Sequence, residues 1–144
     1  MFARMQITID CKDPVRLSEF YGQLLGFEKE EAPEGFPSIE AWLKARNVPQ
    51  EECDDGRAIV DPSGKFPRIW FHKMDTPKPK KNRMHLDCYV GNPPMATAKQ
   101  RKATVDPQVE RALGLGATID ERVADGDYYF VTCLDPEGNE FDIA

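Results

Sequence analysis

The sequence has few of the residues that most often mark a catalytic site, with two histidines and four cysteines among its 144 residues. It has no glycine-rich loop of the dinucleotide-binding or P-loop type, and no serine at the centre of a nucleophile elbow. No apolar run approaches the ~20 residues of a membrane span. The first ten residues also lack the apolar region and cleavage site of a signal peptide, so we expect the mature chain to begin at Met1.

An excess of positive charge is also lacking. The chain has 19 Lys and Arg against 25 Asp and Glu, which gives a formal net charge of −6. Sequence-independent binding to nucleic acid or to an anionic membrane needs a clustered positive field, so we expect neither partner. The one basic run comprises Lys78, Lys80, Lys81 and Arg83, and we interpret it as a solvated connector.

The four cysteines are widely spaced and form no CxxC pair. Cys11, Cys88 and Cys133 each lie in an apolar, strand-like run, where a small reduced side chain suits the surroundings. We therefore predict free thiols and a cytoplasmic protein.

At this length one domain is the default. Hydrophobic periodicity predicts strands at 5–11, near 27, and at 58–60, 68–72, 84–90, 118–123, 128–134 and 140–143. It predicts helices at 14–25, from 39 to 46, and from Pro94 to Leu113 with an interruption before Pro107. Asp13, Ser38 and Asp106 are the expected N-caps, and Gly26 the expected stop of the first helix.

The order of one strand, one helix and about three strands occurs twice. Similar short sequences in the two halves support a duplication. One example is Asp61-Pro62-Ser63-Gly64 and Asp135-Pro136-Glu137-Gly138. We predict an α+β domain over 1–144, with module one at about 1–75, a linker at 76–82 and module two at 83–144. Because one helix covers only one face of a sheet, we expect two tandem βαβββ modules in a curved mixed sheet, with the helices outside and an open concave cavity.

Several motifs resemble the vicinal oxygen chelate superfamily, which includes glyoxalase I, extradiol dioxygenases, and bleomycin and fosfomycin resistance proteins. They lie at 9–14, 20–27, 81–87 and 134–141, and include Phe20-Tyr21 with Leu24-Leu25-Gly26, and Asp135-Pro136-x-Gly138-Asn139. Together they are similar to the glyoxalase-like domain branch. The resemblance covers nearly the whole chain and is specific for the fold rather than for the reaction.

In metal-using members of this superfamily, the ligands occupy the first and last strands of each module. The resemblance assigns these places to Thr8, His85, Asp142, and either Trp70 or His72. Strand alternation independently puts these residues on the open face, together with Asp10, Asp87 and Glu140.

We predict a metal site formed by His85, Asp142 and His72, with Zn, Fe, Mn or Ni as the cofactor. At the position of Thr8 the family usually has a histidine or another strong donor. At the position of Asp142 it usually has a glutamate, which is longer. The alternative is a site without metal, in which His85 is a hydrogen-bonded strand residue beside Asp87 and His72 is solvated.

Asp10 and Asp87 occupy matching places in the two modules, and we predict that they act as general acid and base. The alternative is that each accepts hydrogen bonds from the backbone or from Arg4 and Arg83, which precede the two strands. The remaining polar and aromatic residues expected to line the substrate pocket are Thr8, Trp70, Tyr129 and Glu140.

These residues predict a metal-dependent lyase, isomerase or dioxygenase that acts on a small oxygenated organic substrate. The alternative is a metal-free protein that sequesters an aromatic or cationic small molecule, as antibiotic-resistance proteins of the superfamily do. The net charge of −6 and the aromatic residues suit that second function. The resemblance also implies a homodimer.

Overall fold

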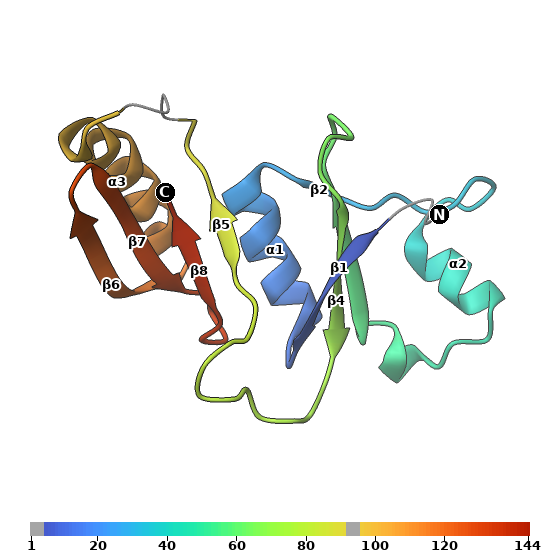
Figure 1. The fold of residues 1–144 in the computed structure, drawn as a ribbon. Coiled ribbons are helices and arrows are strands. Elements are labelled where there is room, and N and C mark those ends of the chain that lie inside the picture. Colours follow the sequence, from blue (N-terminus) through green and yellow to red (C-terminus); the bar gives the residue numbers. More distant parts are fainter. Residues whose placement is uncertain (1–4, 92–95) are drawn as a thin grey trace. The chain divides into compact units, whose positions relative to one another are not determined.

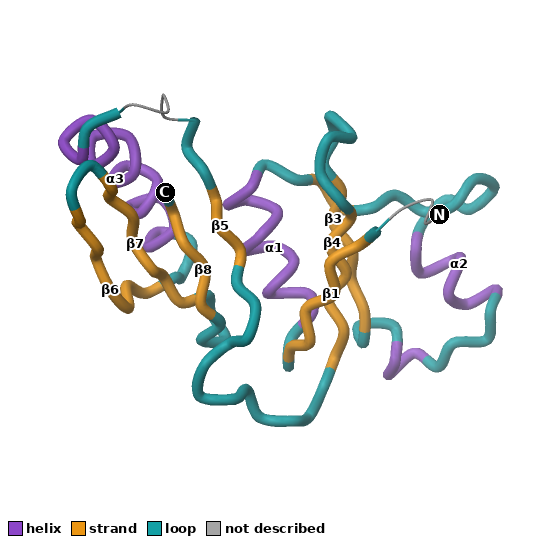
Figure 2. The backbone as a smooth tube through the Cα atoms, in the orientation of Figure 1, coloured by secondary structure: helices purple, strands orange, loops and turns teal. Residues whose placement is uncertain are grey.

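The computed structural model of the protein describes residues 5–91 and 96–144 (Figures 1 and 2). The chain divides into two units, Met1–Asp75 and Thr76–Ala144. The predicted linker at 76–82 belongs to the second unit.

The first unit contains seven elements in chain order. They are β1 (Gln6–Cys11), α1 (Pro14–Leu25), β2 (Glu28–Lys29), α2 (Ile39–Ala45), the 3₁₀ helix η1 (Gln50–Glu52), β3 (Gly56–Val60) and β4 (Arg68–Lys73). The four strands form one sheet in the order β1-β4-β3-β2. β1 runs parallel to β4, and the other neighbours are antiparallel.

The second unit repeats this topology with five elements. They are β5 (Leu86–Cys88), α3 (Ala98–Gly114), β6 (Thr118–Asp125), β7 (Tyr128–Leu134) and β8 (Glu140–Ile143). Their sheet has the order β5-β8-β7-β6, again with the first strand parallel to the last. The predicted α+β class with two tandem βαβββ modules is therefore confirmed, and each module forms a four-stranded mixed sheet.

The first helix begins and ends where its capping residues predict. Asp13 accepts a hydrogen bond from the Arg16 N–H at 3.0 Å, and Pro14 occupies the first turn, where its missing N–H costs nothing. Gly26 ends the helix with φ at 73°, a left-handed conformation that glycine adopts without a steric penalty. Ser38 likewise caps α2 through the Ala41 N–H.

In each unit one helix packs on one face of the sheet. In the first unit, the Tyr21 ring of α1 stacks on Phe71 of β4 with ring centroids 5.7 Å apart. In the second, α3 lies along one face (Figure 1) and buries Val105, Val109 and Ala112. The apolar residues that alternate with polar ones along β4 and β8 are all buried: Ile69, Phe71, Phe141 and Ile143. By alternation, the polar residues between them lie on the opposite face of each sheet.

Two local predictions need correction. The helix of the second module is not interrupted before Pro107, because α3 runs through it from Ala98 to Gly114. Thr97 and Gln100 form the capping box, so Asp106 is no cap, and the buried face of α3 offsets the hydrogen bond that Pro107 lacks. Strand β5 is also shorter than the predicted 84–90, and Pro94 lies outside the described residues.

Within the described part of the chain, no helix combines the length and apolar character that crossing a bilayer requires. All four cysteines are free thiols, and Cys11 and Cys133 are buried.

Candidate metal centre

The helix-free face of the second sheet brings three potential metal ligands together. The parallel pairing of β5 with β8 puts Asp87 directly opposite Asp142. His85 precedes β5 by one residue and shares the face of Asp87, because alternate residues of an extended chain point the same way.

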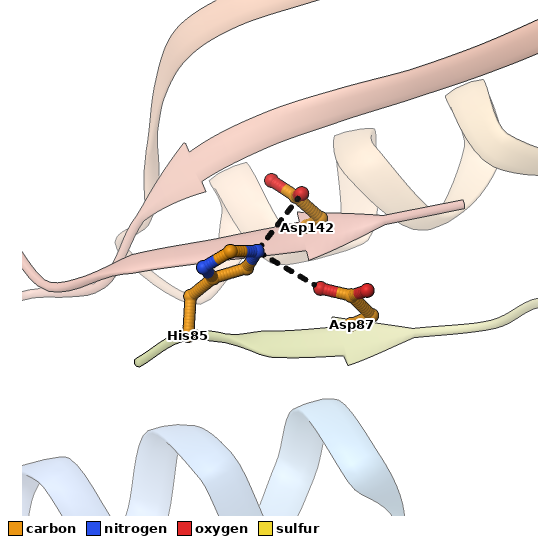
Figure 3. Close-up of side chains that lie close together, drawn as sticks. All are labelled: His85, Asp87 and Asp142. Atoms are coloured by element: carbon orange, nitrogen blue, oxygen red, sulfur yellow. Dashed lines mark ion pairs between the residues drawn. The ribbon is translucent and has the colours of Figure 1, made fainter. Parts of the chain in front are cut away.

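The side chains of these residues converge on one point (Figure 3). The Nε2 atom of His85 lies 3.2 Å from Oδ1 of Asp87 and 3.6 Å from Oδ2 of Asp142. One donor atom from each residue lies within 4.8 Å of the other two. The His85 and Asp87 side chains are 42% and 44% exposed, against 17% for Asp142, so the centre is open to solvent on one side.

The two distances from His85 Nε2 are close to the separation of neighbouring ligands on one divalent ion. Imidazole and carboxylate ligands lie about 2.0–2.2 Å from zinc, so adjacent ligands of a tetrahedral ion are about 3.4 Å apart. One imidazole nitrogen and two carboxylate groups suit borderline divalent metals and leave positions for water or substrate. A divalent charge would also offset the repulsion between the opposed carboxylates.

The neighbouring cysteines are poor candidates for additional ligands or nucleophiles. Burial, reinforced by the negative charges of Asp87 and Asp142, raises the pKa of Cys88 to about 11. Burial likewise raises the pKa of Cys133 to about 11. Cys88 and Cys133 are also in register with Ile143 and Phe141, whose side chains face the helix, so neither thiol shares the face of Asp87 and Asp142.

The first unit has a matching pair of side chains. Asp10 lies opposite His72 in the β1–β4 register, as Asp87 lies opposite Asp142 in β5–β8. His72 is therefore the counterpart of Asp142 in the duplicated fold. The Nδ1 atom of His72 lies 3.3 Å from Oδ1 of Asp10.

Trp70 lies two residues before His72 on the same face and contacts Gly56 and Arg68. A Cβ at Gly56 would overlap the indole Cζ2, so the ring lies against a backbone that has no side chain. The Arg68 guanidinium lies 5.0 Å from the Trp70 ring centroid and binds both carboxylate oxygens of Glu30 at 2.7 Å. Thr8 lies opposite Trp70 in the register.

The other two predicted pocket residues have different surroundings. The Tyr129 ring is buried, and its hydroxyl donates to Asp106 of α3 at 2.6 Å, so it lies on the helix-covered face and we leave it out of the pocket. Glu140 lies on the same face as Asp142 but is 7% exposed, and its carboxylate contacts Lys78, Lys81 and Asn82.

Among the described residues, the side chains paired with the two aspartates are histidines. Asp10 pairs with His72 and Asp87 with His85. Arg4 lies outside the described residues. Sequence reasoning missed Asp87 as a potential ligand because its place opposite Asp142 follows from the pairing of strands more than 50 residues apart.

Comparison with solved structures gives the same fold at low identity. The chain matches a glyoxalase/bleomycin resistance protein/dioxygenase family enzyme from Burkholderia phytofirmans with a TM-score of 0.64 at 21% identity, covering 96% of this chain and 94% of that one. It matches a variant of the fosfomycin resistance protein FosX from Listeria monocytogenes, complexed with Mn(II) and dihydroxypropylphosphonic acid, with a TM-score of 0.61 at 13% identity. That match covers 99% of this chain and 90% of the other.

No curated protein gives a significant match. The family model for the glyoxalase-like domain, in contrast, matches residues 6–144, which is almost the full length. Together with the two βαβββ modules, this match shows that the chain belongs to the glyoxalase-like domain family, within the vicinal oxygen chelate superfamily.

Proposed function

We propose that this protein is a metal-dependent enzyme that acts on a small oxygenated organic molecule by lyase, isomerase or dioxygenase chemistry. The convergence of His85, Asp87 and Asp142 on one point carries the proposal. A divalent ion held by these three residues would act as a Lewis acid that polarises an oxygen atom of the substrate.

The FosX structure supports the proposal by chemical analogy. Its ligands are Mn(II) and a small dihydroxy phosphonic acid, and its fold is the one found here. The three donors of the second unit match the number of protein ligands usual in catalytic zinc sites, which keep a further position for water or substrate.

His72 and Asp10 have a separate role in this proposal. Two donors are fewer than a catalytic metal site uses, whereas an imidazole beside a carboxylate is suited to proton transfer near neutral pH. We assign this pair to general acid–base chemistry.

Metal analysis of protein purified without chelators tests the proposed centre. Wild type should contain close to one metal ion per chain, and His85→Ala and Asp142→Ala should lose it. His72→Ala is the matched control, since it removes the chain's other histidine, and it should retain the metal. Equal metal content in wild type and His85→Ala would refute the proposal.

Thermal unfolding separates the enzyme from a metal-free binding protein. A metal at 100 times its Kd stabilises the folded state by about 2.7 kcal/mol. Addition of EDTA should therefore lower the Tm of wild type and leave that of His85→Ala unchanged. Stabilisation by aromatic or cationic compounds in EDTA, with no effect of metal, would instead select the binding protein.

We further propose that the protein works in the cytoplasm as a homodimer. The four free thiols suit a reducing compartment. Within their sheets β1 and β5 each have one hydrogen-bonded neighbour, and edge strands are sites at which chains pair. Light scattering coupled to size exclusion measures the mass, and a mass of 16.3 kDa would contradict the dimer.

A further inference from the structure

Glu140, the first residue of β8, is a buried carboxylate whose two oxygens contact the segment that precedes His85. Its Oε2 atom accepts a hydrogen bond from the Asn82 N–H at 3.1 Å and lies 3.1 Å from Nζ of Lys78. Its Oε1 atom lies 3.6 Å from Nζ of Lys81. The Glu140 side chain is 6% exposed, so these contacts compensate for the removal of a charged group from water.

The segment that Glu140 contacts has no regular structure to hold it. Residues 76–85 lie in neither helix nor strand, and Pro77 and Pro79 lack the N–H groups that a strand ladder needs. Arg83 and Met84 are exposed, Met84 to 86%, so no apolar core fixes the backbone just before His85.

His85 therefore lies between two points of attachment to the same strand. Upstream, the Asn82 N–H binds the Glu140 carboxylate, and downstream Leu86 pairs with Phe141. Asp87 and Asp142 differ from His85 because both lie within the β5–β8 ladder. Loss of the upstream attachment would release the imidazole and leave the two carboxylates in place.

We propose that Glu140 is a positioning residue for His85: it attaches residues 78–82 to β8 and so directs the imidazole between Asp87 and Asp142. The inference rests on the proposed metal function, which supplies its main readout. Glu140 contributes no ligand of its own, since its oxygens are occupied by Asn82, Lys78 and Lys81.

The test measures the Kd for Zn²⁺ by calorimetry in wild type, Glu140→Ala and Glu140→Gln. Residues that orient a ligand typically change metal affinity about 10- to 100-fold, and we expect a loss of that size in Glu140→Ala. Glu140→Gln should lose less, because its amide oxygen can still accept from Asn82. Glu121→Gln removes the same charge from exposed β6 and should stay within about twofold of wild type.

A double-mutant cycle distinguishes positioning from general destabilisation. His85→Ala loses metal on purification but keeps Asp87 and Asp142, so its weaker Kd for Zn²⁺ can be measured by titration. If Glu140 acts through His85, Glu140→Ala should weaken Zn²⁺ binding in wild type and leave the weaker Kd of His85→Ala unchanged. Equal loss in both backgrounds, or an unchanged Kd in Glu140→Ala, would overturn the inference. If Glu140→Ala does not fold, the Zn²⁺ Kd of Glu140→Gln and of Lys78→Met can be compared with wild type in the same two backgrounds.

The positioning role of Glu140 can still be tested if wild type binds no metal. That result would refute the proposed function, and the inference would then be tested by the ¹⁵N imidazole signals of the metal-free protein. The chain has two histidines, so His72 is an internal reference. Glu140→Gln should shift the His85 signals and leave those of His72 in place, and unchanged His85 signals would contradict the positioning role.

Discussion

The Nε2 atom of His85 faces carboxylate oxygens of two residues, at 3.2 and 3.6 Å. A nitrogen without a hydrogen would meet only acceptors there, so a proton or a metal ion must lie between these atoms. A proton on Nε2 would offer the two carboxylates a single donor, whereas a metal ion satisfies all three donor atoms together. The geometry at this residue is the reason that we favour a metal over a structural histidine.

Asp61 provides a prediction about pH at the scale of one residue. A hydrogen bond from the Ser63 hydroxyl, helped by the backbone N–H groups of Ser63, Lys65 and Phe66, lowers the pKa of Asp61 to about 2. Because the folded pKa lies below the ordinary 3.8, the ionised side chain stabilises the fold above pH 4, and this contribution is lost as the pH falls towards 2.

Replacement of Asp61 by Asn should remove that part of the pH dependence. Denaturant unfolding at several values between pH 2 and pH 5 measures it, as the difference in unfolding free energy between wild type and Asp61→Asn. We expect the difference to shrink as the pH falls. A difference that stays constant over this range would show that the carboxylate does not stabilise the turn through its charge.

The two Asp-Pro-x-Gly turns were predictable from sequence because their chemistry is local. Asp61 accepts from the Ser63 N–H, and Asp135 accepts from the N–H groups of Glu137 and Asn139, as aspartates in such turns do. The capping of α1 and α2 was predictable for the same reason.

At the scale of elements, the first and last strands of each module pair in the same register. This register places one polar pair of residues at the same position in each sheet. Asp10 pairs with His72 across β1 and β4, and Asp87 with Asp142 across β5 and β8. Only the second pair has a histidine two residues before its aspartate, since the corresponding place in β1 is Thr8. The duplicated fold therefore holds three donors in one unit and two in the other.

Contact between β3 and β4 leads to a prediction about Gly56. A Cβ at this position would overlap the Trp70 ring, whose face is in contact with the Arg68 guanidinium. Gly56→Ala should lower the free energy of unfolding by about 1–3 kcal/mol, the usual cost of overpacking, as measured by denaturant unfolding. Gly114→Ala is the control, because nothing lies within 4 Å of its Cβ position, and it should leave stability unchanged or slightly higher. Equal effects of both substitutions would contradict this packing.

Helix α3 shows where element boundaries fail to follow from local signals. Asp106-Pro107 has the form of a helix start, yet Asp106 instead binds Arg122 and Tyr129 of the sheet. The Arg122 contact is at 3.0 Å and joins α3 to β6. Tertiary contacts of this kind outweigh the local preference for a break, and the sequence pattern carries no sign of them.

At the scale of the whole molecule, the duplicated topology was visible in the sequence and the contacts that complete the sites were not. The Glu140–Lys78 ion pair joins residues 62 positions apart in the sequence, and Arg68 binds Glu30 from 38 positions away. No periodicity links such pairs, because each depends on strand order and register rather than on neighbours in the chain. The resemblance to a superfamily predicted His85 and Asp142 as ligands, and the β5–β8 ladder places Asp87 opposite Asp142.

The most direct test of the metal centre is ¹⁵N NMR of the two imidazole rings during titration with Zn²⁺. One equivalent of Zn²⁺ should shift the Nε2 resonance of His85, with no change in the signals of His72. Asp142→Ala should abolish that shift. A His85 spectrum that Zn²⁺ leaves unchanged, or a response confined to His72, would contradict the assignment of His85, Asp87 and Asp142 as the metal centre.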